Sequence, residues 1–249
     1  MDLIRYNGEH SVTFGDKNTW TDWHLIPTSK PVIAPPSVKV KQVDIPGVNG
    51  MIDLTTVLTG YPVYNNRTGS LDFILAPGFE YWENAKTTVM EYLRGRRMNM
   101  YLADDPDHFY VGTFVVSGLK SDARNNGITI NYDLYPFKKD IVASDDQWLW
   151  DPFNFETGVI RSWSSLTVDG ELLISIEDCI EPVMPEITAS AAMTLQHTYR
   201  LADGITTKTK GYTIPAGTSV PGFTLRPGLN SLRFVGTGTL GIHYRGGRL

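Results

Sequence analysis

Helical periodicity occurs in a single segment of this 249-residue chain, and that scarcity limits the fold more than any other feature. Five residues recur there at three- and four-residue steps and so share one helix face: Trp82, Ala85, Val89, Tyr92 and Leu93. Pro77-Gly78 before them and Gly95 after them are typical start and stop signals. We therefore expect one α-helix at about residues 80–94, covering one face of a sheet.

Most other segments alternate apolar and polar residues as strands do. The clearest run is Ile128 to Tyr135, which places every second residue on one apolar face. It follows Asn126-Gly127, which favours a tight hairpin turn, so Tyr110–Val116 is its expected partner strand. Met98, Met100 and Leu102 alternate as a further strand. A sheet with one covering helix is thus predicted for this part of the chain.

A domain boundary is expected near residues 137–147, where the strand pattern ends and a short polar stretch follows. Beyond it, a hairpin is predicted to join Val159–Val168 to Glu171–Ile176 through Asp169-Gly170. Residues 187–245 alternate weakly between Gly and Pro turns, a pattern typical of a sandwich or jelly roll. The predicted fold is mainly β: residues 1–139 form a β-sandwich-like domain with one helix, and residues 140–249 form an all-β sandwich.

Composition excludes several functional classes. The formal net charge of −5 gives no electrostatic basis for tight nucleic-acid binding. The single cysteine, Cys179, permits neither an intramolecular disulfide nor a cysteine-based zinc site, and it is expected to be a small buried hydrophobe. A signal-peptide pattern and a run of about 20 apolar residues are both missing. We expect a cytosol-like compartment, or an exit route that needs no signal peptide.

Two glycine-containing motifs resemble sites of chemistry. Gly236 to Gly241 matches GxGxxG, but nucleotide binding requires a helix after the motif, and here the alternating Leu240, Ile242 and Tyr244 predict a strand. A hairpin turn is the better interpretation of these glycines. Gly217 to Pro221 resembles a nucleophile elbow without its second glycine, so Ser219 is interpreted as a loop serine.

Metal-ligand patterns are also weak. Asp104, Asp105 and Asp107 are interrupted by Pro106 and are interpreted as a polar turn rather than a calcium loop. The histidines are scattered, and none has a partner at helical i, i+4 spacing: His10, His24, His108, His197 and His243. Paired carboxylates of a glycoside hydrolase remain open, because their spacing is spatial. No catalytic, cofactor-binding or metal residue is predicted, and the chain is expected not to be an enzyme.

Aromatic residues leave an alternative. Trp20 and Trp23 form one cluster, and a second contains Trp148, Trp150, Phe153 and Phe155. Such side chains fill cores and protein interfaces, but they also stack on sugar rings. A carbohydrate-binding module that assists attachment to a host cell surface is therefore the alternative to a structural protein.

A succession of short motifs resembles the distal tail protein (Dit) family of siphophages and related prophages of Gram-positive bacteria. In order these are WHLIPTSKPVIAPP at 23–36, VDIPG at 43–47, GMIDL at 50–54, LTGYPVYNNRTG at 58–69, YLRGRRM at 92–98, LADDP at 102–106 and NYDLYPFK at 131–138. Pro185-Glu186-Ile187 and the ending GTGTLGIHYRGGRL are also similar to the family. The resemblance implies a galectin-like C-terminal sandwich, although the sugar-binding motif of galectins is not present.

The resemblance also implies a structural component of the phage tail tip or baseplate. Such proteins form a hexameric ring, built by the N-terminal domains, through which DNA passes. The implied partners are other copies of the chain, the tail tube protein, the tape measure protein, the tail-associated hub protein and, in some phages, receptor-binding proteins. The implied location is the virion tail tip, assembled in the host cytoplasm. Pro27 to Pro36 cannot be a helix or central strand, and we hypothesise an extended arm or loop that packs on a neighbour.

Overall fold

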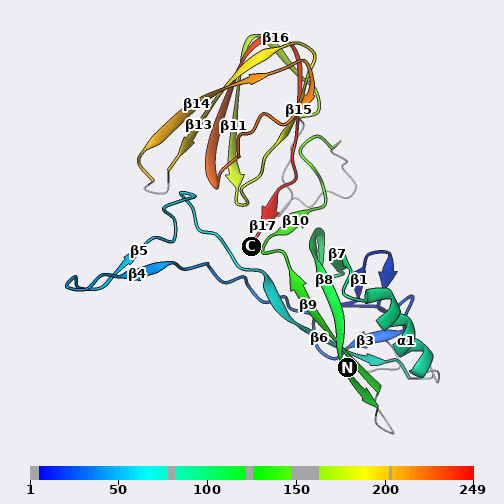
Figure 1. Ribbon diagram of the computed structural model, residues 1–249. Helices are drawn as coiled ribbons and strands as arrows, with labels where there is room; N and C mark the ends of the chain where they lie inside the picture. The colour runs from blue at the N-terminus through cyan, green and yellow to red at the C-terminus, as the bar shows by residue number, and fades with distance from the viewer. Residues whose placement is uncertain (1–5, 78–81, 122–125, 147–162, 202–203) are drawn as a thin grey trace. The chain divides into compact units, whose positions relative to one another are not determined.

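The structure is a computed structural model that describes residues 6–77, 82–121, 126–146, 163–201 and 204–249. Within these ranges the fold is mainly β with one helix, α1 (Trp82–Leu93), as the sequence predicts (Figure 1). The chain divides into two compact units. Unit 1 contains residues 1–38, 64–139 and 249, and unit 2 contains residues 39–63 and 140–248.

Unit 1 is built on an antiparallel sheet in the order β2-β1-β7-β8-β9-β6-β3. The strands are β1 (Val12–Phe14), β2 (Lys17–Asn18), β3 (Leu25–Pro27), β6 (Arg67–Leu75), β7 (Arg97–Leu102), β8 (Asp105–Ser121) and β9 (Asn126–Leu134); the short β10 (Lys138–Asp140) follows.

The central hairpin β8–β9 confirms the expected pairing. Ile128, Ile130 and Tyr132 are buried on one face of β9, and Tyr132 lies opposite Phe114 of β8. The predicted turn at Asn126-Gly127 is wrong, since both residues belong to β9 and pair with the end of β8. β8 is longer than its apolar run, because the ladder continues through a register shift after Val116. Residues 122–125, which connect the strands, lie outside the described part of the chain.

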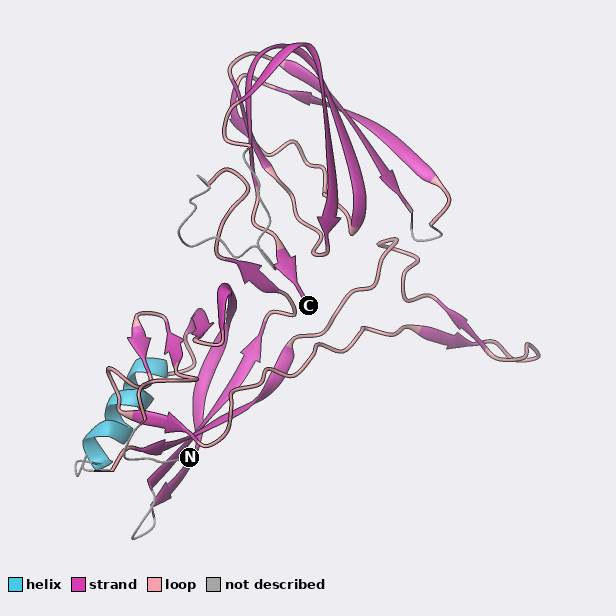
Figure 2. Cartoon of the chain, turned by 180° about the vertical axis from the view of Figure 1, so that it is seen from behind, coloured by secondary structure: helices cyan, strands magenta, loops and turns pink. Residues whose placement is uncertain are grey.

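α1 covers the sheet of unit 1, as Figure 2 shows. Its buried residues Trp82, Val89 and Leu93 pack in one core with Phe14 and Phe114. The helix ends where Arg94 and Gly95 take positive φ angles of 41° and 71°, and the Gly95 amide donates to the Phe114 carbonyl at 3.0 Å. The predicted start at Pro77-Gly78 includes a residue outside the described ranges.

Unit 2 contains a second antiparallel sheet in the order β14-β13-β16-β12-β15, with β11 also paired to β16. Its strands are β11 (Leu166–Cys179), β12 (Glu186–Ala189), β13 (Met193–Arg200), β14 (Thr207–Ile214), β15 (Gly217–Ser219) and β16 (Gly228–His243); β17 (Gly247–Arg248) is short. A separate hairpin consists of β4 (Gln42–Asp44) and β5 (Met51–Asp53).

Glycines bend the long strands of unit 2 instead of ending them. Gly236 and Gly238 lie inside β16, whose first half pairs with β13 and whose second half pairs with β12. Gly170 lies inside β11, opposite Gly236. The predicted hairpin at Asp169-Gly170 and the predicted turn at Gly236–Gly241 are therefore both wrong. Glycine permits a sharp bend that carries a paired strand around a corner of the sheet.

The core of unit 2 follows the alternation of these strands. Leu195 and Tyr199 of β13 point inward with Leu232 and Phe234 of β16. Cys179 is buried, as expected. No helix in the described ranges is long and apolar enough to cross a membrane.

Candidate assembly surface

An apolar hairpin is the main exposed feature of unit 2, and we call residues Lys39–Val63 the arm. In β4–β5, Val43 lies opposite Ile52, and Gly47 and Gly50 take positive φ angles in the turn between the strands. The Lys39 amide donates to the Val63 carbonyl at 2.7 Å, which joins the two ends of the arm. The arm therefore consists of the β4–β5 hairpin and an irregular segment, residues 54–63, that returns to lie beside Lys39 (Figure 1).

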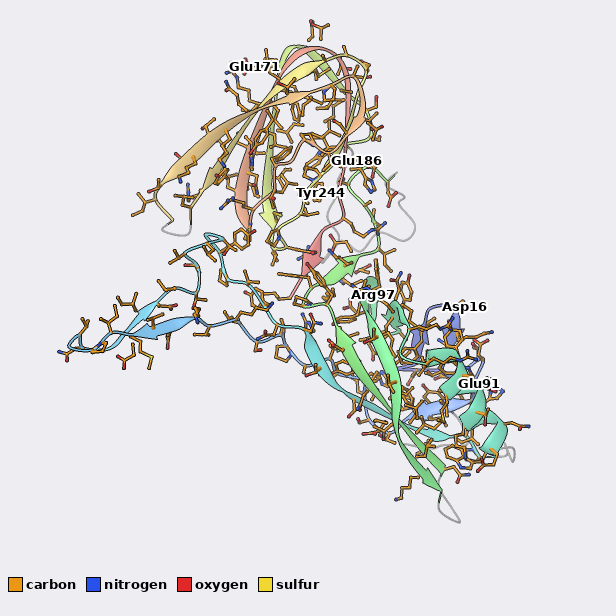
Figure 3. All side chains as sticks on the ribbon, viewed as in Figure 1. Asp16, Glu91, Arg97, Glu171, Glu186 and Tyr244 are labelled. Carbon is orange, nitrogen blue, oxygen red and sulfur yellow. The ribbon has the colours of Figure 1, made fainter. Side chains whose placement is uncertain are left out.

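Side chains project from both sides of the arm (Figure 3), and its large apolar side chains are exposed. Leu58 is 98% exposed, Val57 66% and Met51 63%. Nine large hydrophobic residues of the arm are exposed: Val40, Val43, Ile45, Val48, Met51, Ile52, Leu54, Val57 and Leu58. A concentration of exposed apolar side chains in one segment marks a candidate site of protein association.

The net charge of the arm and its two-stranded sheet both favour a role in protein association. The arm carries Lys39, Lys41, Asp44 and Asp53, so its formal charges cancel. Hydrogen bonds from Thr55 lower the pKa of Asp53, which keeps that carboxylate ionised at the base of β5. An isolated two-stranded hairpin is marginally stable in water and gains order by packing on another surface. Apolar burial, rather than net charge, would therefore drive its association.

Sequence patterns alone do not mark this arm as an exposed surface. The available signal was Pro46-Gly47 and Asn49-Gly50 between the apolar runs of VDIPG and GMIDL, which is hairpin chemistry. A short alternating run does not reveal whether a core covers it, because that depends on the tertiary structure.

The proline-rich segment Pro27–Pro36 lies before the arm and is irregular after the edge strand β3, as predicted. It packs on its own unit: the amide of Ala34 donates to the Tyr132 hydroxyl at 3.3 Å, and Arg67 Nη1 donates to the Ala34 carbonyl at 3.2 Å. Arg67 is buried and also donates from Nε to the Pro136 carbonyl at 2.7 Å. Burial lowers the pKa of this guanidinium. Arg67 thus fixes the segment that leads into the arm.

Asp104, in the turn before β8, and Asp105, the first residue of β8, pair with histidine and lysine side chains. His10 Nδ1 lies 2.8 Å from Asp104, while His108 Nδ1 and Lys138 Nζ each lie 2.6 Å from Asp105. Burial raises the pKa of Asp105, but the hydrogen bonds from His108 and Lys138 outweigh it and hold the pKa at about 2. These contacts tie the start of β8 to neighbouring segments of unit 1. The polar-turn prediction holds for Asp104 and is wrong for Asp105 and Asp107, which lie in β8.

The other residues considered from sequence do not converge on one site. In unit 2, His243 pairs with Asp145 and the buried His197 pairs with Asn230. Ser219 lies in the edge strand β15 rather than in a loop. Among the described residues, no group of three or more His, Cys, Asp or Glu is placed to hold a metal ion.

The aromatic clusters divide between described and undescribed residues. Trp23 is buried in the core of unit 1, where its ring stacks on Phe14 at 6.0 Å, and the half-buried Trp20 meets Tyr6 edge-on at 4.8 Å. Both rings are therefore structural. The second cluster, Trp148 to Phe155, lies outside the described residues. Within the described ranges, none of the exposed large hydrophobic residues is aromatic.

The chain is similar in fold to solved structures, one of which is a phage Dit protein. No family model matches the chain, and no curated protein does. The crystal structure of the Dit protein (gp 19.1) of phage SPP1 matches with a TM-score of 0.55 and 12% sequence identity, over 94% of this chain and 98% of that one. That protein is described as a paradigm of the hub adsorption apparatus in phages that infect Gram-positive bacteria. This chain therefore has the fold of a phage Dit protein, the structural neighbour that the sequence resemblance predicts.

Proposed function

We propose that this chain is a non-enzymatic structural component of a phage tail tip that joins copies of itself through the arm. The observation that carries the proposal is the exposed apolar hairpin on a chain with the fold of SPP1 Dit. Burying one Leu or Ile side chain contributes about 1.5–3 kcal/mol, so several arm residues buried together can offset the entropy lost on association.

The arrangement that fits best is a hexameric ring, with residues 1–139 building the ring and residues 140–249 forming a galectin-like domain. In a closed ring, every copy makes the same pair of head-to-tail contacts with its neighbours, whereas contacts that do not close would form a filament. The net charge of −5 suits a bore for DNA, because a negative wall does not retain phosphates. The proposed partners are the tail tube, tape measure, hub and receptor-binding proteins of a virion tail assembled in the host cytoplasm.

The test is the mass of the full-length protein and of one arm variant. We expect the wild type to form a closed multimer with rising concentration, measured by native mass spectrometry and negative-stain microscopy. Leu58→Asp should raise the protein concentration at the midpoint of assembly at least tenfold, because it replaces an exposed apolar side chain of the proposed interface with a charge.

The matched control is Leu173→Asp, which changes an exposed leucine, 62% accessible, on the outer face of β11. It should leave assembly unchanged. A wild type that stays monomeric up to about 100 μM with its tail-tip partner present, or rings that tolerate Leu58→Asp, would contradict the proposed interface.

A further inference from the structure

A buried amide fixes the turn that precedes β16. Asn230 is fully buried, and its Oδ1 accepts the Arg226 amide at 2.8 Å. Its Nδ2 donates to the carbonyls of Arg226 at 2.7 Å and Gly228 at 3.0 Å. One side chain thus satisfies three backbone groups and sets the path of the chain at Arg226.

His197 holds that amide from within the core. Its Nε2 donates to Asn230 Oδ1 at 3.0 Å, and its ring lies 5.1 Å from Phe223 and 5.0 Å from Tyr199. His197 is 1% exposed, so this pair is set by the packing of β13 against β16. The backbone from which the Arg226 side chain projects is therefore rigid.

The Arg226 guanidinium reaches from this turn to the second root of the arm. Nη1 donates to the Thr59 carbonyl at 3.0 Å. Cζ lies 4.4 Å from the ring centre of Tyr199 in β13 and 5.7 Å from that of Tyr61 in the arm. Both distances suit cation–π attraction. Among the described residues, no carboxylate lies within ion-pair distance of Arg226, so the two rings and the carbonyl are its partners.

The arm root is shaped to receive this side chain. Gly60 has a φ angle of 77°, and a Cβ atom there would lie 3.1 Å from Arg226 Nη1. The Thr59 hydroxyl donates to the Tyr61 carbonyl at 2.6 Å, which tightens the same turn. Within the described arm, the other hydrogen bonds stay inside the arm, so Arg226 supplies the hydrogen bond between the arm and the rest of unit 2.

We propose that Arg226 is a positioning residue that clamps the arm root Thr59–Tyr61 between Tyr61 and Tyr199 and so preorganises the apolar hairpin for binding. The clamp itself depends only on these contacts. Its role in assembly rests on the proposed function, in which the arm packs on a second copy of the chain. Holding a binding segment in one orientation strengthens association because less conformational entropy is lost on binding.

Hydrogen–deuterium exchange of the full-length protein tests the clamp directly. In Arg226→Ala, the amides of residues 56–61, which include the Gly60 amide bonded to the Thr56 carbonyl at 2.7 Å, should exchange at least tenfold faster, because one cation–π contact and one charged hydrogen bond are lost. Arg226→Lys keeps the charge and the backbone turn but loses the planar fork, and it should give an intermediate increase.

Two further variants separate the clamp from general destabilisation. Tyr61→Ala removes the ring on the arm side without altering the sandwich and should loosen the arm like Arg226→Ala, whereas Tyr61→Phe keeps the ring and should behave as the wild type. Arg233→Ala is the matched control: it removes a surface arginine that pairs with Glu171 and does not contact the arm. Exchange in β13 should stay unchanged in the Tyr61 variants.

The outcomes distinguish the clamp from the proposed function. Faster arm exchange together with an assembly midpoint raised about tenfold supports both. Faster exchange with unchanged assembly supports the clamp and contradicts the arm as the assembly element. Arm exchange in Arg226→Ala and Tyr61→Ala that matches Arg233→Ala would overturn the clamp, whatever the oligomeric state.

Discussion

The bend in β16 should require glycine at position 238, and Gly238→Ala measures that requirement. Gly238 has a φ angle of 144°, a conformation that side chains of L-residues rarely adopt. An added Cβ would lie 2.4 Å from Ser190 Oγ and 3.2 Å from Met193 Cε. Ser190 Oγ accepts the Thr239 amide at 2.8 Å, so moving it away breaks that hydrogen bond.

The expected cost follows from these two effects. Forcing a non-glycine residue into this region costs about 1–3 kcal/mol. Losing the Ser190–Thr239 hydrogen bond adds about 1 kcal/mol. The sum, about 2–4 kcal/mol, is a large part of the stability of a domain and should lower the melting temperature of unit 2 by roughly 10 °C or more.

Differential scanning calorimetry of the full-length protein measures this change, and exchange of β11 and β16 amides assigns the transition to unit 2. Gly211→Ala is the matched control, because Gly211 in β14 has no positive φ angle and no atom within 4 Å of an added Cβ. It should change stability by less than about 0.5 kcal/mol. If Gly238→Ala and Gly211→Ala melted at the same temperature, the bend would not depend on glycine.

Three further perturbations test other parts of the fold. Burial lowers the pKa of His197, so unit 2 should lose stability as the pH falls below 6.5, the ordinary value, and His197→Gln should flatten that part of a urea-denaturation profile. The pKa of Asp105, held at about 2, predicts that unit 1 loses stability as the pH falls from 3.8 towards 2. Asp105→Asn should lower the free energy of unfolding by about 1–2 kcal/mol at pH 7, after allowance for solvent screening. If the loss of stability below pH 3.8 were the same in Asp105→Asn, the pairing of Asp105 with His108 and Lys138 would be contradicted. Gly112→Ala places a Cβ 2.2 Å from the Asp133 carbonyl oxygen, so it should lower the unit 1 melting transition by roughly 10 °C; equal lowering of both transitions would count against independent units.

Local periodicity was sufficient to predict whether several segments form a helix or a strand. The three- and four-residue spacing from Trp82 to Leu93 predicted α1, and the alternation from Ile128 to Leu134 predicted the buried face of β9. Both follow from backbone geometry, which fixes where successive side chains point without reference to the rest of the chain. The mainly β class and the Dit-like fold were accessible from sequence for the same reason, together with the order of the motifs.

The tertiary structure decided what the glycines and the exposed apolar runs do. Glycine is typical of turns, and the sequence around Gly170, Gly236 and Gly238 predicts turns. In the structure, β16 pairs with β13 along its first half and with β12 along its second half, so the strand continues and bends. Likewise, the alternation of VDIPG and GMIDL predicts strands, yet only the absence of a covering core among the described residues makes the arm a surface. Whether a strand ends, bends or lies exposed depends on its neighbours in space, and residues distant in sequence supply those neighbours.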